Sequence, residues 1–414
     1  MNVSKSIIRI FDLDISRSNL DNFLQVLFLL LAFFLPISVS IAKIILITFL
    51  IVFVATGNFK EKISFLKKNY LSIFSILFFF CYILGILWTE DLQWGLIMLR
   101  KMADFFLFLP VLLFFSKRYF FDKAIDFFLV SIFLVCLLTL AVHFQIIEKL
   151  YKGSLGSPNV TMSHITAGVF YAFSLYIALE RILSGKLVKN YSKFFNWTLV
   201  FILIYTLLIS NSRTGFILLG LVLLITYINF NRGGILLGSI WISLILTIFF
   251  TLSYKYIPQF HDRTDALISN IGDYRSGKNY DTSVGQRLTW TLNSLEIIKD
   301  NFWFGVGTGD FNKEHDKIFQ NLQFKVQNTV NPHNMYILVA TQLGIFGLIA
   351  LLSIFIHQIK FSLQETNKSM KRLGLFLPIM FIVINFGDSY LLGHFTTTLF
   401  IFFSSFLYKD FEKY

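Results

Sequence analysis

The sequence predicts an all-α fold: a polytopic transmembrane helical bundle of about twelve spans with one large loop outside the membrane. Composition is the first observation behind this prediction, since 56% of the 414 residues are hydrophobic and only 14% are charged. Soluble domains usually carry about 25% charged residues. The second observation is that apolar runs of roughly 17–20 residues recur along the chain, each long enough to cross a hydrocarbon layer of about 30 Å. We therefore expect lipid around most of the molecule.

The apolar runs define the predicted spans. The first apolar block, 23–57, is too long for a single crossing, and Pro36 and Lys43 favour a break into two spans. The predicted span 102–116 is the shortest and follows two basic residues directly. The full set is 23–39, 41–57, 70–88, 102–116, 124–144, 164–182, 194–211, 214–231, 234–253, 334–356, 373–387 and 389–408.

Loop charges predict the orientation of the bundle. An even number of spans places both termini on one side, and the short loops on that side are rich in lysine and arginine. The positive-inside rule therefore predicts cytoplasmic termini in a bacterial inner membrane. The same bias explains the net charge of +12. We therefore expect membrane lipids as partners and no nucleic acid. The opposite short loops hold only Lys43, Arg100, Lys101, Lys149, Lys152 and Arg213.

One long polar loop divides the chain into three parts. Residues 1–253 form a predicted N-terminal bundle of about nine spans, 254–332 form a large loop on the periplasmic side, and 333–414 contain about three more spans. Loops of this length translocate regardless of their charge. In compact proteins they are usually functional. We therefore expect the functional site to lie at this face.

The loop contains two recognisable segments. Leu288, Leu292 and Leu295 recur at helical spacing, so 283–301 predicts an amphipathic helix that lies on the membrane or on the bundle. The glycine-rich stretch 304–311 (FGVGTGDF) is similar to a phosphate-cradling loop. It lies on the side opposite cytoplasmic ATP in the predicted topology, and a turn is therefore the favoured interpretation.

His333 is the first candidate for chemistry, because it stands at the start of an apolar span in NPHN. Asn331 suits an N-cap and Pro332 the first helical position, which would place His333 in the first turn. The positive end of the helix dipole disfavours an imidazolium there. A neutral imidazole can act as a general base. The alternative is an interfacial histidine that only satisfies backbone groups.

Two arginines are predicted on the same face. Arg213 lies in a tight turn between two spans, and Arg287 lies in the predicted loop helix. Their planar donor forks suit bidentate phosphate binding, although arginines at span ends also extend to lipid headgroups. Asn334, His164 and Asp388 are further candidates for lining a shared cavity, with helix capping as the more ordinary role. No His, Cys and carboxylate group has metal-ligand spacing, so neither a metal nor another cofactor is expected.

These motifs, in this order, carry a resemblance to a known family. SRTG at a span start, a long loop with a QR helix and an FGVGTGDF turn, and NPHN opening a span resemble the O-antigen ligase and polymerase family of membrane glycosyltransferases. The distinctive motifs lie between about 210 and 352. The resemblance implies a GT-C-like, metal-independent, inverting enzyme. It would transfer a glycan from undecaprenyl diphosphate to lipid A–core oligosaccharide at the periplasmic face.

The resemblance also assigns roles to individual residues. His333 corresponds to the family's histidine that acts as base on the acceptor hydroxyl. Arg213 and Arg287 correspond to the arginines that hold the donor diphosphate. A transferred glycan already has an activated diphosphate linkage, so this chemistry needs no nucleotide. It does need a base near the nucleophile and cations near the leaving group.

Several alternatives remain at this point. Within the family, a repeat-unit polymerase or a protein O-oligosaccharyltransferase would share the pattern, and the PHN motif with twelve spans favours the ligase. A lipid-linked oligosaccharide flippase or transporter is the alternative from another class. Transporters usually show charges or broken helices near the bilayer midplane, and often paired repeats. Here the charges are predicted at span ends and no repeat is evident.

Overall fold

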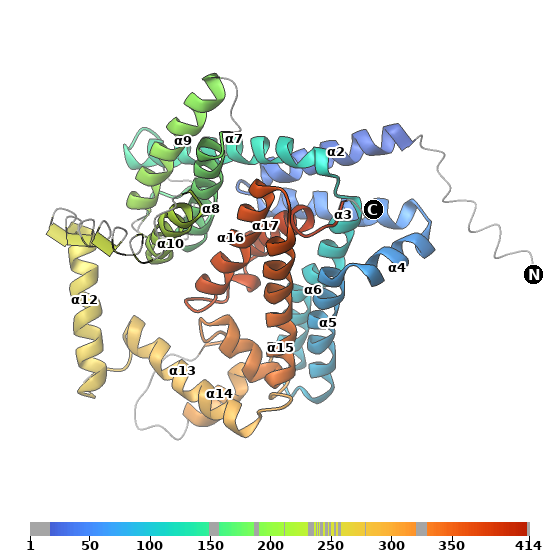
Figure 1. The fold of residues 1–414 in the computed structure, drawn as a ribbon. Helices are drawn as coiled ribbons and strands as arrows, with labels where there is room; N and C mark the ends of the chain where they lie inside the picture. The colour runs from blue at the N-terminus through green and yellow to red at the C-terminus, as the bar shows by residue number, and fades with distance from the viewer. Residues whose placement is uncertain are drawn as a thin grey trace, which may run out of the picture.

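The computed structural model of the chain describes residues 17–148, 157–185, 190–210, 212–230, 258–277, 279–319 and 329–411, with isolated positions from 236 to 255. Throughout these residues the regular secondary structure is helical, so the all-α prediction is confirmed. Figure 1 shows the helices gathered around a central C-terminal helix.

The helices before the long loop are α2 (Arg17–Phe34), α3 (Val39–Ala55), α4 (Phe59–Lys68), α5 (Tyr70–Gly85), η1 (Ile86–Trp88), α6 (Leu92–Phe115), α7 (Arg118–His143), α8 (His164–Leu183), α9 (Asn190–Ile209) and α10 (Arg213–Phe230). The loop region contains α12 (Pro258–Arg275), α13 (Ser283–Asp300) and α14 (Phe311–Phe319). The chain ends with α15 (Met335–Gln364), α16 (Lys368–Ile384), η2 (Tyr390–Leu392) and α17 (His394–Leu407).

The helices agree well with the predicted spans. Six described helices are long and apolar enough to cross a membrane, or seven if the bent pair α3 and α4 counts as one span. Shorter apolar helices at 19–34 and 394–407 add to these. Every predicted span except 234–253 coincides with a helix, and 234–253 lies largely outside the described residues. The chain is therefore a polytopic helical membrane protein, whereas the number of twelve spans stays a prediction.

One predicted boundary is wrong, and the error concerns charged residues. The helix expected at 102–116 begins ten residues earlier, at Leu92, where the Asp91 side chain accepts a hydrogen bond from Trp94 N (3.0 Å) as its N-cap. Arg100 and Lys101, which were expected in a loop, consequently lie inside α6, where Asp104 forms an ion pair with Lys43 of α3. Charged groups therefore occur within helices as well as at their ends, because pairing offsets part of the cost of burial.

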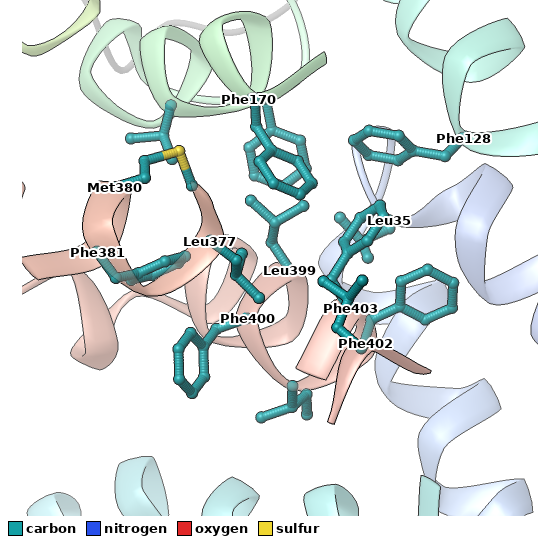
Figure 2. Packing of buried hydrophobic residues seen from close by; sticks show 14 of the residues in the cluster. Leu35, Phe128, Phe170, Leu377, Met380, Phe381, Leu399, Phe400, Phe402 and Phe403 are labelled. Carbon is teal, nitrogen blue, oxygen red and sulfur yellow. The ribbon is translucent and has the colours of Figure 1, made fainter. Parts of the chain in front are cut away.

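The hydrophobic core is built largely from aromatic side chains. The described part of α17 from Thr396 to Leu407 is buried on all sides, so this helix lies at the centre of the bundle. Figure 2 shows phenylalanines of α17 packed against side chains from α2, α7, α8 and α16. The Phe173 and Phe403 rings, for example, approach to 4.6 Å between centroids at 76°. Edge-to-face pairs of this kind add to the energy of area burial.

Contacts between helix termini show which helices begin or end at the same end of the bundle. Four segments meet at one end of the bundle. They are the Pro36 carbonyl after α2, the segment before α8, the start of α10, and the turn between α16 and α17. At the other end, Lys409 after α17 donates to the Phe114 and Ser116 carbonyls at the end of α6. This pairing follows the up-and-down alternation that the sequence predicts.

The loop helices attach to the first of these ends through the glycine-rich stretch. Helix α15 is broken at Gly344, which has φ +63°, and the break removes the helical partners of the Thr341 and Gln342 carbonyls. Val306 N and Gly307 N donate to these two carbonyls instead, at 2.9 and 3.0 Å. The broken helix therefore serves to hold the loop. The interpretation of FGVGTGDF as a turn is confirmed.

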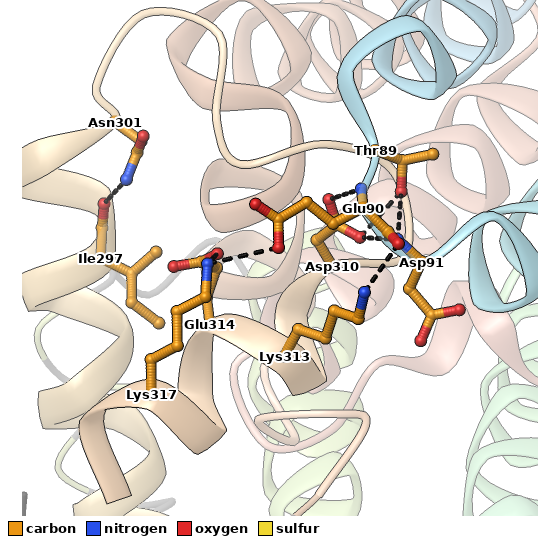
Figure 3. Close-up of polar contacts among 9 residues, drawn as sticks. All are labelled: Thr89, Glu90, Asp91, Ile297, Asn301, Asp310, Lys313, Glu314 and Lys317. Atoms are coloured by element: carbon orange, nitrogen blue, oxygen red, sulfur yellow. Dashed lines mark hydrogen bonds and ion pairs between the residues drawn. The ribbon is translucent and has the colours of Figure 1, made fainter. Parts of the chain in front are cut away.

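A buried carboxylate completes this attachment. Asp310 is 1% exposed and accepts hydrogen bonds from Glu90 N and Asp91 N, both at 2.7 Å, and from the Thr89 hydroxyl at 2.8 Å. Figure 3 shows these contacts between the loop and the turn before α6, with Lys313 donating to the Glu90 carbonyl beside them. Bonds to a charged acceptor are the strong ones. We call Asp310 and these three donors the loop clasp.

The predicted amphipathic helix is present as α13, but its leucines face outward. Leu288, Leu292 and Leu295 are 39%, 56% and 51% exposed. The face toward the bundle instead carries Trp290 and Ile297, which are 6% and 5% exposed. Helix α13 therefore packs on the bundle, as one of the two predicted positions required, but it does so through Trp290 and Ile297 and not through the leucines.

Candidate active site

The NPHN segment does not start its helix where the sequence suggested. Helix α15 begins at Met335, and the side chain of Asn334 is the N-cap, accepting from Tyr336 N (3.0 Å) and Ile337 N (3.1 Å). The expected cap at Asn331 is therefore wrong, and His333 lies just before the helix. Two asparagines compete for the capping position, and the later one reaches the free N–H groups.

His333 occupies an unusual backbone conformation. Its φ is +55°, in the left-handed region that few residues other than glycine adopt. The Asn331 side chain supports this conformation, because its Oδ1 accepts from His333 N (3.0 Å) and from the Ser389 hydroxyl (2.8 Å). A strained residue that its surroundings hold in place is a frequent feature of functional sites.

The imidazole of His333 is held from two sides. Its Nδ1 lies 3.0 Å from Asp388 Oδ1, and its ring stacks on Trp290 at 5.4 Å between centroids and 28° between planes. Within the described residues Nε2 has no hydrogen-bond partner. Because an acceptor at Nδ1 stabilises the tautomer with the proton there, Nε2 is left as the atom that can accept a proton.

Asp388 is the residue that connects the histidine to the nearby cations. Burial alone would raise the pKa of its carboxyl group, but the hydrogen bond from His333, the Ser389 N–H and the charge of Arg287 together lower the pKa below its ordinary value. Asp388 is therefore a carboxylate at neutral pH. Arg287 lies close enough to act on this carboxylate, yet it forms no hydrogen bond or ion pair among the described residues.

Arg213 is placed next to the same group by the start of α10. Ser212 caps this helix by accepting from Gly215 N (3.0 Å), so Arg213 is its first residue. The adjacent Thr214 hydroxyl accepts from the Tyr390 hydroxyl at 2.7 Å, and Tyr390 lies two residues after Asp388. The structure thus brings Arg213, Arg287, His333 and Asp388 to one region.

A cavity of about 310 Å³ opens beside Asp388, at the lower end of the usual range of about 300–1,000 Å³ for ligand sites. His333, Arg213 and Arg287 are not among its described lining residues. Asp388, Asn331 and Tyr390 form one wall. The opposite wall comes from α6 and the first turn of α8, and it includes Lys101. We call this space the site cavity. Its described lining residues are Trp94, Met98, Lys101, Ser163, Ile165, Thr166, Val330, Asn331, Asp388, Ser389, Tyr390, Leu392, Gly393 and Thr396.

The remaining predicted site residues have different positions. Ser163 and Thr166, on either side of His164, line the site cavity, whereas the His164 side chain is not among its described walls. Asn334 uses its side chain to cap α15 and to donate to the Phe386 carbonyl (3.3 Å). Its amide therefore connects the start of α15 with the segment that follows α16. Within the described residues, no three His, Cys, Asp or Glu side chains form a group suited to a metal ion.

Three residues of this region were not selected from the sequence. Trp290 follows Arg287 by three residues, and this helical spacing could have indicated that both face one site. Tyr390 follows Asp388 by two residues in the same turn. Lys101 is a charge within an apolar helix, and such residues are commonly functional in membrane proteins.

Comparison with known proteins agrees with this architecture. The family model described as "O-Antigen ligase" matches residues 198–352, a segment that includes Arg213, Arg287 and His333 but neither Asp388 nor Lys101. An uncharacterized protein of Haemophilus influenzae is 28% identical over 357 residues, which cover 84% of this chain and 85% of that protein. The resemblance inferred from the sequence is therefore confirmed over residues 198–352, which match the O-antigen ligase family model within a helical membrane protein.

Proposed function

We propose that this chain is an inverting membrane glycosyltransferase that transfers a glycan from undecaprenyl diphosphate to a hydroxyl group of lipid A–core oligosaccharide. His333 is the general base of this proposal, and Asp388 is the positioning residue that acts through it. Arg213 and Arg287 bind the donor diphosphate. The reaction takes place at the periplasmic face of the inner membrane, with both termini in the cytoplasm.

The arrangement of His333 and Asp388 is the observation that carries the proposal. Transfer to a sugar hydroxyl requires a base whose proton-accepting atom faces the substrate and whose ring is held in one tautomer. The 3.0 Å contact at Nδ1 and the stack on Trp290 supply that restraint. The side chain of His333 is still 32% exposed, so its ring can be reached by a substrate.

The cations support the donor half of the reaction. A departing diphosphate gains negative charge, which fixed guanidinium groups stabilise. Arg287 has no ion-pair partner among the described residues, and its positive charge already acts on Asp388. The N-terminal end of α10, next to Arg213, carries the positive end of the helix dipole and is a second favourable place for a phosphate.

The proposed step balances in atoms and charge. The acceptor hydroxyl transfers its proton to Nε2 of His333 while its oxygen forms a bond to the anomeric carbon of the glycan. The bond from that carbon to the diphosphate oxygen breaks, and undecaprenyl diphosphate leaves with the bonding electrons. Attack opposite to the leaving group inverts the anomeric configuration. The proton on His333 then passes to water.

Complementation of a strain that lacks this gene tests the proposal. His333→Ala should abolish the glycan ladder on lipopolysaccharide while lipid-linked glycan accumulates and the variant protein is present at normal abundance in membranes. His261→Ala is the matched control, because His261 lies on α12 with a side chain 45% exposed. A normal ladder with His333→Ala would remove the base assignment. A ladder of single repeat units would favour the polymerase instead.

A further inference from the structure

A second cavity lies at the opposite end of the bundle from the site cavity. It has a volume of about 790 Å³ and is enclosed by α2, α4, the junction between α6 and α7, and the segment after α17. Both α6 and α17 run from the site cavity to this one. Figure 1 shows the C-terminal end beside α3 and α4, far from α13 and α14. We call this space the basic cavity.

Cations dominate the lining of the basic cavity. Five of its described lining residues are cationic and two are carboxylates. The cationic residues are Lys62, Lys68, Lys117, Arg118 and Lys409, and the carboxylates are Asp21 and Glu61. Since Lys117 and Asp21 form an ion pair at 2.5 Å, the remaining positive charge exceeds the negative charge. Such a surplus favours an anionic ligand.

Lys62 is a buried cation with two hydrogen bonds. The residue is only 2% exposed, and its ammonium group donates to the Phe53 carbonyl and to the Thr56 hydroxyl (3.0 Å). These groups belong to the C-terminal end of α3, where positive charge is favourable. An ammonium group has three N–H donors, and among the described residues the remaining one has only the Phe53 and Phe59 rings, whose centroids lie 4.7 and 5.1 Å from Nζ. A phosphate is a stronger acceptor for it than an aromatic ring.

Lys409 repeats this arrangement at the end of α6. The residue is 7% exposed, and its ammonium group donates to the Phe114 carbonyl (2.9 Å) and the Ser116 carbonyl (2.7 Å). The remaining N–H has the Phe65 ring, whose centroid lies 5.2 Å from Nζ. Two nearly buried ammonium groups, each with one N–H that has only aromatic rings as partners in the described part of the chain, therefore line the same cavity.

The rim of the basic cavity adds two cations without partners. Lys68 ends α4, and Arg118 begins α7. Neither forms a hydrogen bond or ion pair within the described part of the chain. Arg118 can present two parallel N–H groups to a phosphate, and Lys68 a point charge. The rim and the lining thus offer the donors that one phosphate group needs.

The position of α4 connects the basic cavity with the bilayer surface. This helix bends by 118° from α3, so it runs across the end of the bundle instead of continuing through it. Its apolar residues Phe59 and Ile63 are 53% and 51% exposed, while Lys62 and Lys68 line the cavity. Tyr119, 58% exposed, extends this apolar rim from α7. An amphipathic helix with these features lies in the plane of the membrane interface.

We propose that the basic cavity binds the phosphate group of an anionic phospholipid whose acyl chains extend along α4 and α7. The phosphate accepts from Lys68 and Arg118 at the rim and from the remaining donors of Lys62 and Lys409. Apolar side chains at the rim contact the chains of the lipid. This site is independent of the glycan-transfer site, since the two cavities lie at opposite ends of α6 and α17.

Native mass spectrometry of the full chain in detergent, titrated with phosphatidylglycerol or phosphatidylcholine, tests this proposal. The test variant is Lys68→Gln with Arg118→Gln, which leaves the buried lysines intact. The control is Lys60→Gln with Lys67→Gln, which removes two exposed charges from α4 outside the cavity. Each juxtamembrane cation contributes about 1 kcal/mol to binding of an anionic lipid. We therefore expect phosphatidylglycerol to bind the test variant roughly tenfold to thirtyfold more weakly.

Each outcome of the titration supports or overturns the proposed lipid site. Weaker phosphatidylglycerol binding in the test variant alone, with little phosphatidylcholine binding throughout, supports the site. An equal loss in both variants would mean attraction by general surface charge and would overturn it, as would no loss in either. Displacement of the lipid by millimolar inorganic phosphate would identify a site for soluble phosphate instead. Unchanged size-exclusion profiles exclude misfolding as the cause.

Discussion

Nδ1 of His333 lies 3.0 Å from Oδ1 of Asp388, although the two residues are 55 positions apart and belong to segments on either side of α15 and α16. This contact combines three features that are weak when taken alone. The histidine has a left-handed backbone, the carboxylate is 22% exposed, and Arg287 acts on that carboxylate. Together they describe an oriented base beside a source of positive charge.

Replacing Asp388 tests whether it acts through His333. Asp388→Asn removes the negative charge but keeps the size of the side chain, so we expect glycan transfer to fall by roughly 10²–10⁴-fold. The double variant with His333→Ala should be no slower than His333→Ala alone, because residues that act as a unit are not additive. Transfer is measured in membranes with lipid-linked donor. Additive losses would show that Asp388 acts separately, and Asp300→Asn, the same change at an exposed residue of α13, serves as the control.

The form of the cation at position 287 is a second test. Arg287→Lys keeps the charge but loses the planar fork, and Arg287→Gln loses both. If Arg287 binds diphosphate through two parallel N–H groups, Arg287→Lys should recover only a small part of the donor affinity that Arg287→Gln loses. The KM for the lipid-linked donor measures this. Full activity in Arg287→Lys would point to a purely electrostatic role, and full activity in Arg287→Gln would exclude the assignment.

Lys101 provides a third test, because it lines the site cavity while its neighbour Arg100 does not. A charged hydrogen bond contributes about 1.5–3 kcal/mol, so Lys101→Gln should lower kcat/KM by roughly 10-fold to 100-fold. Arg100→Gln removes the same charge from an exposed position of the same helix and should change kcat/KM less than about threefold. Equal effects of the two changes would show that only the general charge of α6 matters.

Lys409 gives the chain a pH-dependent stability. Burial first, and the charge of Lys117 second, lower the pKa of the Lys409 ammonium from 10.5 to about 7. Between these values the unfolded chain binds more protons than the folded chain, so the free energy of unfolding rises with pH by at most about 1.4 kcal/mol per pH unit. Thermal scans from pH 7 to pH 9 should therefore show the wild-type Tm rising relative to that of Lys409→Met. Parallel curves for the two proteins would contradict the low pKa, and Lys67→Met is the exposed control.

The sequence predicted the fold well because span prediction depends on composition. Helical spans need only long apolar runs, and lipid makes that requirement strict. The boundary of α6 was missed for the same reason. Lys101 and Asp104 interrupt the apolar run, and only tertiary pairing of Asp104 with Lys43 explains how this helix accommodates charge.

The site was predicted as a set of residue types on one face, without the contacts among them. His333, Arg213 and Arg287 stand in recognisable motifs, whereas Asp388 has no motif and joins the group through tertiary contact alone. The two asparagines around His333 show a further limit. Both have the same capping propensity, yet Asn334 is the N-cap. The Asn331 side chain instead accepts a hydrogen bond from the hydroxyl of Ser389, which lies far away in sequence.

The loop clasp yields the last prediction, which concerns stability. Asp310→Asn replaces one of the two carboxylate oxygens with an NH2 group. Because Glu90 N donates to Oδ2 and Asp91 N to Oδ1, one of these two N–H groups then faces a donor instead of an acceptor. Leaving one such donor unsatisfied costs about 1–3 kcal/mol, so we expect a loss of that size and a Tm lower by several degrees. Asp300→Asn, at the exposed end of α13, is the isosteric control. Because the clasp holds α14 against the turn before α6, trypsin should also cut faster at Lys313 and Lys317 in Asp310→Asn. An unchanged Tm together with unchanged cleavage would show that the glycine-rich stretch alone holds the loop.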